Sequence, residues 1–81
     1  MAKVLLFGRL SDLAGWRERT FEPAPPRLSA LKALIAEGDH ALGEALEGPG
    51  VRAAVDKVLV RGDVALAAGT EVAFLPPMSG G

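Results

Sequence analysis

The segment Lys3-Val4-Leu5-Leu6-Phe7-Gly8-Arg9 decides the fold that this sequence predicts. We expect a strand here, with Val4 and Leu6 on one face and Leu5 and Phe7 on the other, because successive side chains of a strand point to opposite faces. Apolar residues on both faces indicate a strand at the centre of a sheet, covered on each side.

The segment Glu71-Val72-Ala73-Phe74-Leu75 is the second strongly apolar strand of the sequence, and it follows a tight turn at Ala68-Gly69-Thr70. A more polar strand is expected over residues 16–22. It comes after a turn or a short helical turn over residues 10–15. The two apolar strands therefore lie at opposite ends of the chain, and the more polar elements lie between them.

Helices are expected in the middle of the chain. Ser29 is a plausible N-cap for a helix over residues 30–37. Asp39 is a plausible cap for a second, short helix that carries Leu42 and Leu46 on one face.

The order of these elements predicts the fold class. Residues 51–55 and 57–60 indicate a strand pair or one bent strand around Asp56. We place the first and last strands side by side and parallel at the sheet centre, because they are the most apolar and a helix connects the two halves. The expected fold is α+β: a β-grasp (ubiquitin-like) roll with a mixed sheet, one main helix and a short second helix. It occupies residues 1–75, and residues 76–81 form a flexible C-terminal tail.

Composition excludes several classes of function. The 81 residues include no cysteine, so disulfides, thiolate metal sites and a cysteine nucleophile are excluded. The net charge is −1 with acidic and basic residues interspersed, which disfavours nucleic-acid binding. No apolar run approaches the roughly 20 residues that span a bilayer, and a signal peptide is not expected. We expect a cytoplasmic protein of one domain, with some apolar surface left for a protein partner.

The interior of the chain shows no catalytic constellation. His40 is the sole histidine, and without a cysteine or a second histidine it makes a poor metal site, so we expect it to be solvated. Neither Ser11, Ser29 nor Ser79 lies in a nucleophile elbow, and no phosphate-binding glycine loop is present.

The chain ends in Pro76-Pro77-Met78-Ser79-Gly80-Gly81. Glycine has no Cβ, so Gly80 and Gly81 make a thin end that can enter a narrow channel and present the α-carboxylate of Gly81. Six extended residues reach roughly 20 Å. A loose terminus and a cloning remnant are the alternative interpretations of the two glycines alone.

Residues 71–81 resemble the C-terminus of the small subunit of molybdopterin synthase, a family that ends in Glu-Val-Ala-Phe, an apolar residue, Pro-Pro, an apolar residue, Ser or Thr, and Gly-Gly. The segments 3–15 and Ala53-Ala54-Val55-Asp56 are similar to the first strand and to a third-strand motif of this family. Three departures concern the electrostatics toward a partner: Asp56 stands where asparagine is frequent, Ser11 where arginine is common, and residues 68–70 where an acidic turn is frequent.

The resemblance implies a sulfur carrier in molybdenum cofactor biosynthesis. A ubiquitin-activating-like adenylyltransferase uses ATP to adenylate the Gly81 carboxylate, and sulfur displaces AMP to leave a thiocarboxylate. This end, kept narrow by Gly80, donates sulfur to a cyclic pyranopterin phosphate in the large synthase subunit, within an expected heterotetramer. The chain is then not an enzyme alone, and it binds no metal or cofactor of its own.

The same resemblance implies a docking surface made of Phe7, Leu59 and Leu75 together with the tail residues Pro76, Pro77, Met78 and Ser79. Strand alternation places Phe74 opposite to Leu75, so one set of side chains faces the helix and the other forms an open apolar patch. We expect Phe7, Leu59 and Leu75 to be partly exposed in the isolated chain.

Three alternative functions remain open at the level of sequence. The chain could carry sulfur for thiamine thiazole or another thiolated product, although the pattern of residues 74–81 argues against this. It could be a ubiquitin-like modifier that conjugates to lysine through Gly81. It could also be a non-catalytic β-grasp interaction domain with an inert tail.

Overall fold

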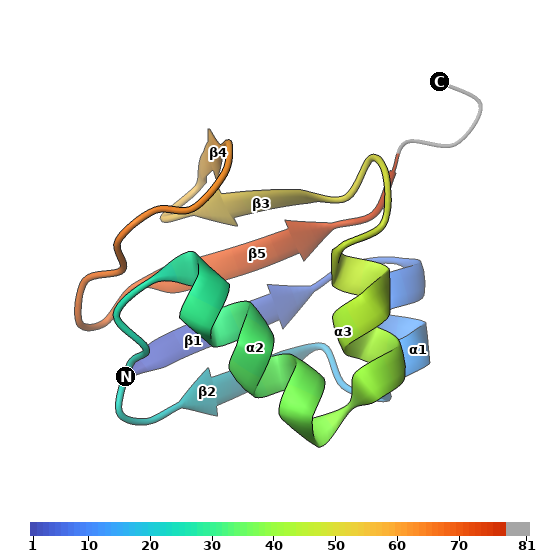
Figure 1. The fold of residues 1–81 in the computed structure, drawn as a ribbon, viewed down its shortest axis with the longest axis horizontal. Coiled ribbons are helices and arrows are strands. Elements are labelled where there is room, and N and C mark those ends of the chain that lie inside the picture. The colour runs from blue at the N-terminus through green and yellow to red at the C-terminus, as the bar shows by residue number, and fades with distance from the viewer. Residues whose placement is uncertain (78–81) are drawn as a thin grey trace.

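Five strands and three helices make up residues 1–77, the part of the chain that the computed structural model describes (Figure 1). In chain order they are β1 (Ala2–Leu6), α1 (Arg9–Ala14), β2 (Glu18–Phe21), α2 (Leu28–Gly38), α3 (His40–Leu46), β3 (Arg52–Val55), β4 (Val58–Val60) and β5 (Glu71–Leu75). The strands form one sheet in the order β2-β1-β5-β3-β4. The neighbours β1 and β5 are parallel and the other pairs are antiparallel, so the expected parallel pair at the centre of a mixed sheet is confirmed.

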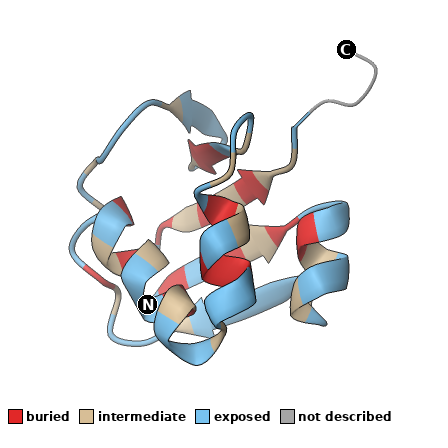
Figure 2. Cartoon of the chain, turned by 45° about the vertical axis from the view of Figure 1, so that its right-hand side comes forward, coloured by how far each residue is buried: buried red, intermediate tan, exposed pale blue. Residues whose placement is uncertain are grey.

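The hydrophobic core lies between one face of the sheet and the helices α2 and α3. Figure 2 shows that buried residues gather where these helices meet the strands. On β1, Val4 and Leu6 are at most 2% exposed, while Leu5 is only half-buried and Lys3 is exposed. The expectation that β1 is covered on each side is therefore wrong, because residues 1–77 place a helix layer over only one face.

The segment after β1 forms the short helical turn that the sequence allows there. It is the six-residue helix α1, so the described residues contain one helix more than the main helix and the short second helix expected. Leu10 is the buried residue of α1, and Gly15 ends the helix in the left-handed conformation. The hydroxyl of Ser11 donates to the Gly8 carbonyl oxygen at 2.8 Å, which gives this residue a local structural role.

The two caps predicted for α2 and α3 have different outcomes. Ser29 is not an N-cap, because α2 begins at Leu28, two residues before the expected start, and Arg27 holds the cap position without a side-chain capping bond. The Ser29 backbone N–H and hydroxyl instead donate to the Asp63 carboxylate at 2.8 and 2.9 Å. Asp39 does cap α3, since its Oδ1 accepts a hydrogen bond from the Leu42 backbone at 3.1 Å.

Residues 51–60 form a strand pair and not one bent strand. The antiparallel strands β3 and β4 are joined by Asp56 and Lys57, whose φ angles of 49° and 72° are those of a two-residue hairpin turn. The Asp56 carboxylate accepts hydrogen bonds from the Thr70 hydroxyl and the Glu71 backbone N–H, both at 2.9 Å. The Glu71 bond, followed by the Thr70 bond, lowers the pKa of Asp56. Asp56 therefore ties the hairpin turn to the start of β5.

Candidate functional site

The sheet face turned away from the helices carries a row of apolar side chains. The strand registers place Ala54 opposite both Leu59 and Ala73, and Ala73 opposite Leu5, so the row crosses β4, β3, β5 and β1. Leu59 at one end is 56% exposed. Alternation along the strands puts this row opposite to the core-facing set that includes Phe74, which is completely buried.

Phe7 and Leu75 extend this apolar surface toward the end of the described chain. Phe7 directly follows β1 and is 44% exposed, and Leu75 ends β5 and is half-buried. The expected partial exposure of Phe7, Leu59 and Leu75 is thus confirmed, while their part in docking stays a prediction. We call the surface made of Leu5, Phe7, Leu59, Ala73 and Leu75 the open-face patch.

The tail begins next to this patch. From Leu75 the chain continues into Pro76, which is half-buried, and Pro77, which is exposed. The predicted site residues Met78, Ser79, Gly80 and Gly81 lie outside the described residues. The structure therefore places the base of the tail beside the open-face patch, and the role assigned to Gly81 remains a prediction.

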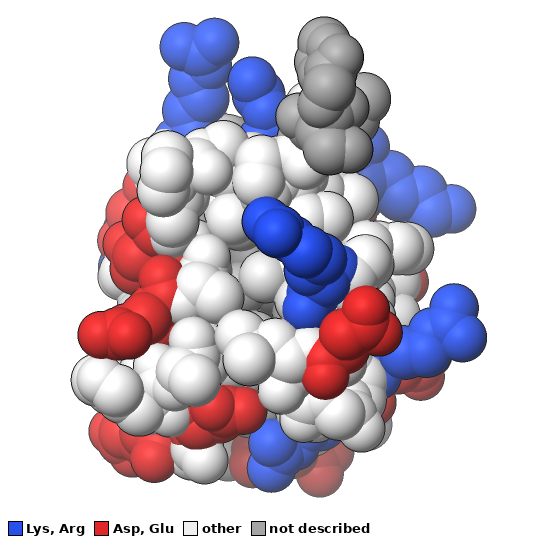
Figure 3. Space-filling model, turned by 90° about the vertical axis from the view of Figure 1, so that its right-hand side faces the viewer, with Lys and Arg blue, Asp and Glu red and all other residues white. Residues whose placement is uncertain are grey.

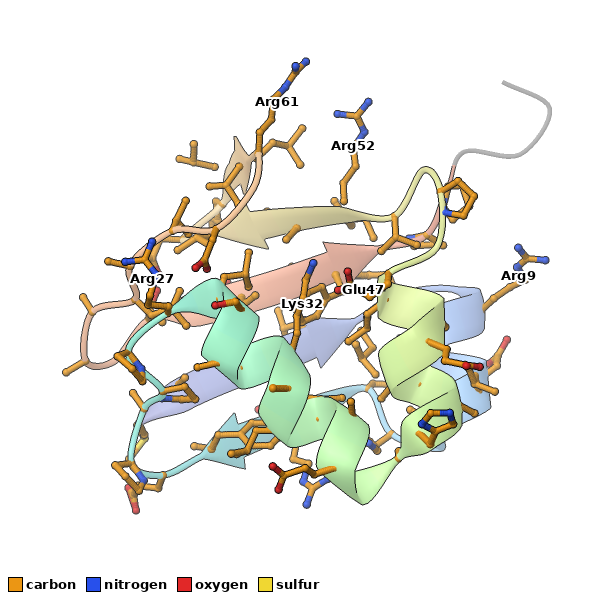
Figure 4. All side chains as sticks on the ribbon, in the orientation of Figure 1. Arg9, Arg27, Lys32, Glu47, Arg52 and Arg61 are labelled. Atoms are coloured by element: carbon orange, nitrogen blue, oxygen red, sulfur yellow. The ribbon has the colours of Figure 1, made fainter. Side chains whose placement is uncertain are left out.

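In Figure 4, Arg52 and Arg61 extend from the β3–β4 side of the molecule, while Arg9 extends from α1 at the right-hand edge. Arg9 begins α1, Arg52 begins β3 opposite Leu75, and Arg61 directly follows β4. All three are exposed and form no ion pair within residues 1–77. Figure 3 shows Lys and Arg side chains over the upper part of this side of the molecule and more Asp and Glu side chains lower down. Sequence reasoning did not single out Arg52 and Arg61, which line the same groove, because nothing local links positions 52 and 61.

A groove of about 800 Å³ lies between α2 and the β3–β4 hairpin. Lys32 and Glu47, which point toward each other in Figure 4, form an ion pair of 3.2 Å on its wall. Asp63, at its rim, pairs with Arg27 at 2.7 Å, and the Arg27 and Ser29 hydrogen bonds lower the pKa of Asp63 to about 2. Arg52 and Arg61 also line the groove, and they form no ion pair within residues 1–77.

Residues 1–77 contain no group of histidine and carboxylate side chains that could hold a metal ion. The His40 side chain is 86% exposed and pairs only with Glu44 on its own helix, so the expected solvated histidine is confirmed. No helix within the described range combines the length and apolar character that a membrane crossing requires. Of the features expected from the sequence, the open-face patch and the adjoining tail base remain as the candidate site.

A mixed sheet with a parallel central pair and helices packed on one face defines a ubiquitin-like β-grasp protein. The fold is similar to the solution structure of small archaeal modifier protein 1 from Methanosarcina acetivorans, with a TM-score of 0.85 and 20% identity over 99% of this chain and 95% of that one. It is also similar to a putative molybdopterin converting factor, subunit 1, from Pyrococcus furiosus, with a TM-score of 0.71 and 28% identity over 95% and 97% of the two chains.

The chain belongs to the ThiS family, whose model matches residues 4–81. It is 37% identical to the molybdopterin synthase sulfur carrier subunit of Escherichia coli (strain K12), over the full length of both chains. These similarities bear out the resemblance in the sequence. They support the role of a sulfur carrier rather than that of an enzyme acting alone.

Proposed function

We propose that the chain is the sulfur-carrying small subunit of a molybdopterin synthase. The observation that carries this proposal is the full-length match, at 37% identity, to a protein named as such a carrier. The open-face patch beside the tail base supports it, because an exposed apolar surface next to a reactive end suits a chain that docks before it delivers a group.

The proposed chemistry takes place on the α-carboxylate of Gly81. A terminal carboxyl has a pKa of about 3.3–3.7, so it is an anion at neutral pH and resists nucleophilic attack. An adenylyltransferase that resembles ubiquitin-activating enzymes activates it: the carboxylate attacks ATP, an acyl adenylate forms and pyrophosphate leaves. A donor of sulfide-level sulfur then forms a C–S bond at the adenylate carbonyl and displaces AMP, which leaves a thiocarboxylate. Transfer of this sulfur to a cyclic pyranopterin phosphate returns the carboxylate, with water supplying the oxygen that replaces the sulfur, and two loaded chains are consumed for one dithiolene.

The large synthase subunit is the proposed acceptor of the open-face patch, within a heterotetramer in the cytoplasm. Pro76 and Pro77 suit the base of an inserting tail, since proline restricts the backbone and lowers the entropy lost on binding. Residues 76–81 are then the sulfur-carrying tail of a domain that spans residues 1–75. The chain itself supplies a surface and a terminus, and the catalytic groups belong to its partners.

Intact mass spectrometry tests this proposal. The chain is incubated with ATP, a sulfur donor and the activating enzyme, and then with the large subunit and the pyranopterin. We expect a mass shift of one oxygen-to-sulfur exchange, which disappears as dithiolene forms. Deletion of Gly81 should abolish both changes and leave the circular dichroism spectrum unchanged, while His40→Ala should behave as the wild type. A chain without Gly81 that still supports dithiolene formation would refute the mechanism.

A ubiquitin-like modifier is the second candidate function. The fold does not separate it from a carrier, because a protein named as an archaeal modifier has the same fold at a TM-score of 0.85. An isopeptide adduct between Gly81 and a lysine, found by peptide mapping, would favour the modifier. Sulfur transfer to a thiazole precursor but not to the pyranopterin would instead favour a carrier for another thiolated product.

A further inference from the structure

Two glycines lie directly against the two prolines at the base of the tail. A Cβ atom on Gly50 would lie 2.7 Å from the Pro77 Cβ and 3.5 Å from its Cα. A Cβ atom on Gly8 would lie 3.0 Å from the Pro76 Cγ. Gly8 follows β1 and Gly50 precedes β3, so the contacts come from both sides of β5. In Figure 1 the loop that leads into β3 passes beside the end of β5.

The contact at Gly50 is the tighter of the two. A distance of 2.7 Å is shorter than carbon atoms tolerate, so any side chain at this position must displace Pro77. The ring of proline joins its side chain to the backbone nitrogen, so displacing the Cβ also displaces the backbone. The 3.0 Å contact at Gly8 reaches the outer edge of the Pro76 ring, where a small shift of the ring gives some relief.

We propose that Gly50, supported by Gly8, is a positioning residue that sets the direction in which the tail leaves the domain. This inference rests on the proposed function, in which the tail delivers sulfur. Leu75, the residue before the prolines, belongs to the open-face patch. Docking of the open-face patch on the partner therefore also fixes the direction in which the tail leaves the domain. The tail base is oriented before binding, so less entropy is lost when it meets the partner.

The chain offers a matched control for Gly50→Ala. Gly50 and Gly15 have φ angles of +84° and +82°, so alanine meets the same kind of backbone strain at both positions. No heavy atom lies within 4 Å of the position of a Cβ on Gly15. The two variants thus differ in the contact with Pro77, and a comparison between them separates the position of the tail base from the strain of the turn.

The first measurement is by NMR and requires no sulfur transfer. In the wild type and in Gly15→Ala we expect nuclear Overhauser effects between residue 50 and Pro77. In Gly50→Ala we expect the carbon shifts of Pro76 and Pro77 to change. Wild-type spectra without these effects, or unchanged proline shifts in Gly50→Ala, would overturn the proposed contact.

The second measurement separates docking from delivery. For the loaded chain and the large subunit, we expect the single-turnover transfer rate of Gly50→Ala to fall about 10- to 100-fold below that of Gly15→Ala, since misplacement of a reacting group by about 1 Å can cost this much. The dissociation constants of the two variants should agree within about twofold. Equal transfer rates would overturn the inference, whereas a loaded wild-type chain that transfers no sulfur would instead refute the proposed function.

A double-mutant cycle keeps the test valid if Gly50→Ala disturbs the fold. Pro77→Gly removes the Cβ that a side chain at position 50 would meet. In the Pro77→Gly background, Gly50→Ala should therefore cost no more in transfer rate or in unfolding midpoint than Gly15→Ala does. A full additional loss in that background would show that Gly50 acts through its own turn and not through the tail.

Discussion

Leu59→Ala should weaken binding to the large synthase subunit without unfolding the chain. Leu59 is 56% exposed at one end of the open-face patch. Complete burial of a leucine side chain stabilises by about 1.5–3 kcal/mol, so burial of the exposed half of Leu59 on docking should contribute roughly half of this free energy to binding. A loss of about 1–1.4 kcal/mol corresponds to a five- to tenfold rise in the dissociation constant.

Leu34→Ala is the matched control for this prediction. Leu34 is 45% exposed, but it lies on α2, which covers the opposite face of the sheet. Isothermal titration calorimetry of each variant with the purified large subunit measures the two dissociation constants, and urea denaturation verifies that both variants fold. We expect binding of Leu34→Ala within about twofold of the wild type.

Two results would refute the reasoning that the open-face patch docks. The first is a Leu34→Ala variant that weakens binding as much as Leu59→Ala does. The second is a Leu59→Ala variant that binds with wild-type affinity. Either result would place the interface elsewhere, although the carrier chemistry proposed for Gly81 could still hold.

Three further predictions concern the stability of the fold. Gly43→Ala should lower the urea midpoint, because a Cβ at position 43 would lie 2.8 Å from the Ala36 Cα. Overpacking of this kind costs about 1–3 kcal/mol, which outweighs a gain of up to about 1 kcal/mol in helix propensity. Gly38→Ala is the control and should not lower the midpoint, since no atom lies close to a Cβ at position 38. Phe74→Ala should cost about 3–5 kcal/mol by the same assay, because the side chain is completely buried; a smaller loss would show that the core collapses around the gap. Asp63 has a pKa lowered to about 2 in the folded chain, so its contribution to stability is present above about pH 4 and is lost as the pH falls toward 2. Asp63→Asn should therefore lower the urea midpoint at pH 7, and the midpoints of the variant and the wild type should converge near pH 2. A constant difference between the two midpoints across this range would contradict the assignment.

The agreement between sequence and structure is best where a residue acts within its own element. Alternation along β1 and β5 correctly separated the face of Val4 from that of Leu5, and the face of Phe74 from that of Leu75, because a period of two depends only on the local backbone. The cap of α3 by Asp39 was also found, since its partner Leu42 is three residues away. The whole of α1 was harder to recognise, because six residues are too short to show a clear helical period.

The predictions that were wrong concern residues whose partners lie far away in the sequence. Ser29 has the composition of an N-cap, yet its hydroxyl and backbone N–H bind Asp63, which lies 34 residues away. The expectation that β1 is covered on both faces failed because apolar residues on a second face are compatible with a docking surface as well as with a second layer. A sequence pattern records which faces are apolar, but it does not record what covers them.

The sequence by itself determined the β-grasp order of elements, the absence of cysteine chemistry and the terminal Gly-Gly that motivates the carrier role. These properties depend on composition, local periodicity and the order of residues along the chain. Only the tertiary structure brought Arg52 and Arg61 to the wall of the same groove, and placed Gly50 against Pro77. The physical reason is that contacts between distant segments depend on strand order and register, which are set by packing of the whole sheet against its helices.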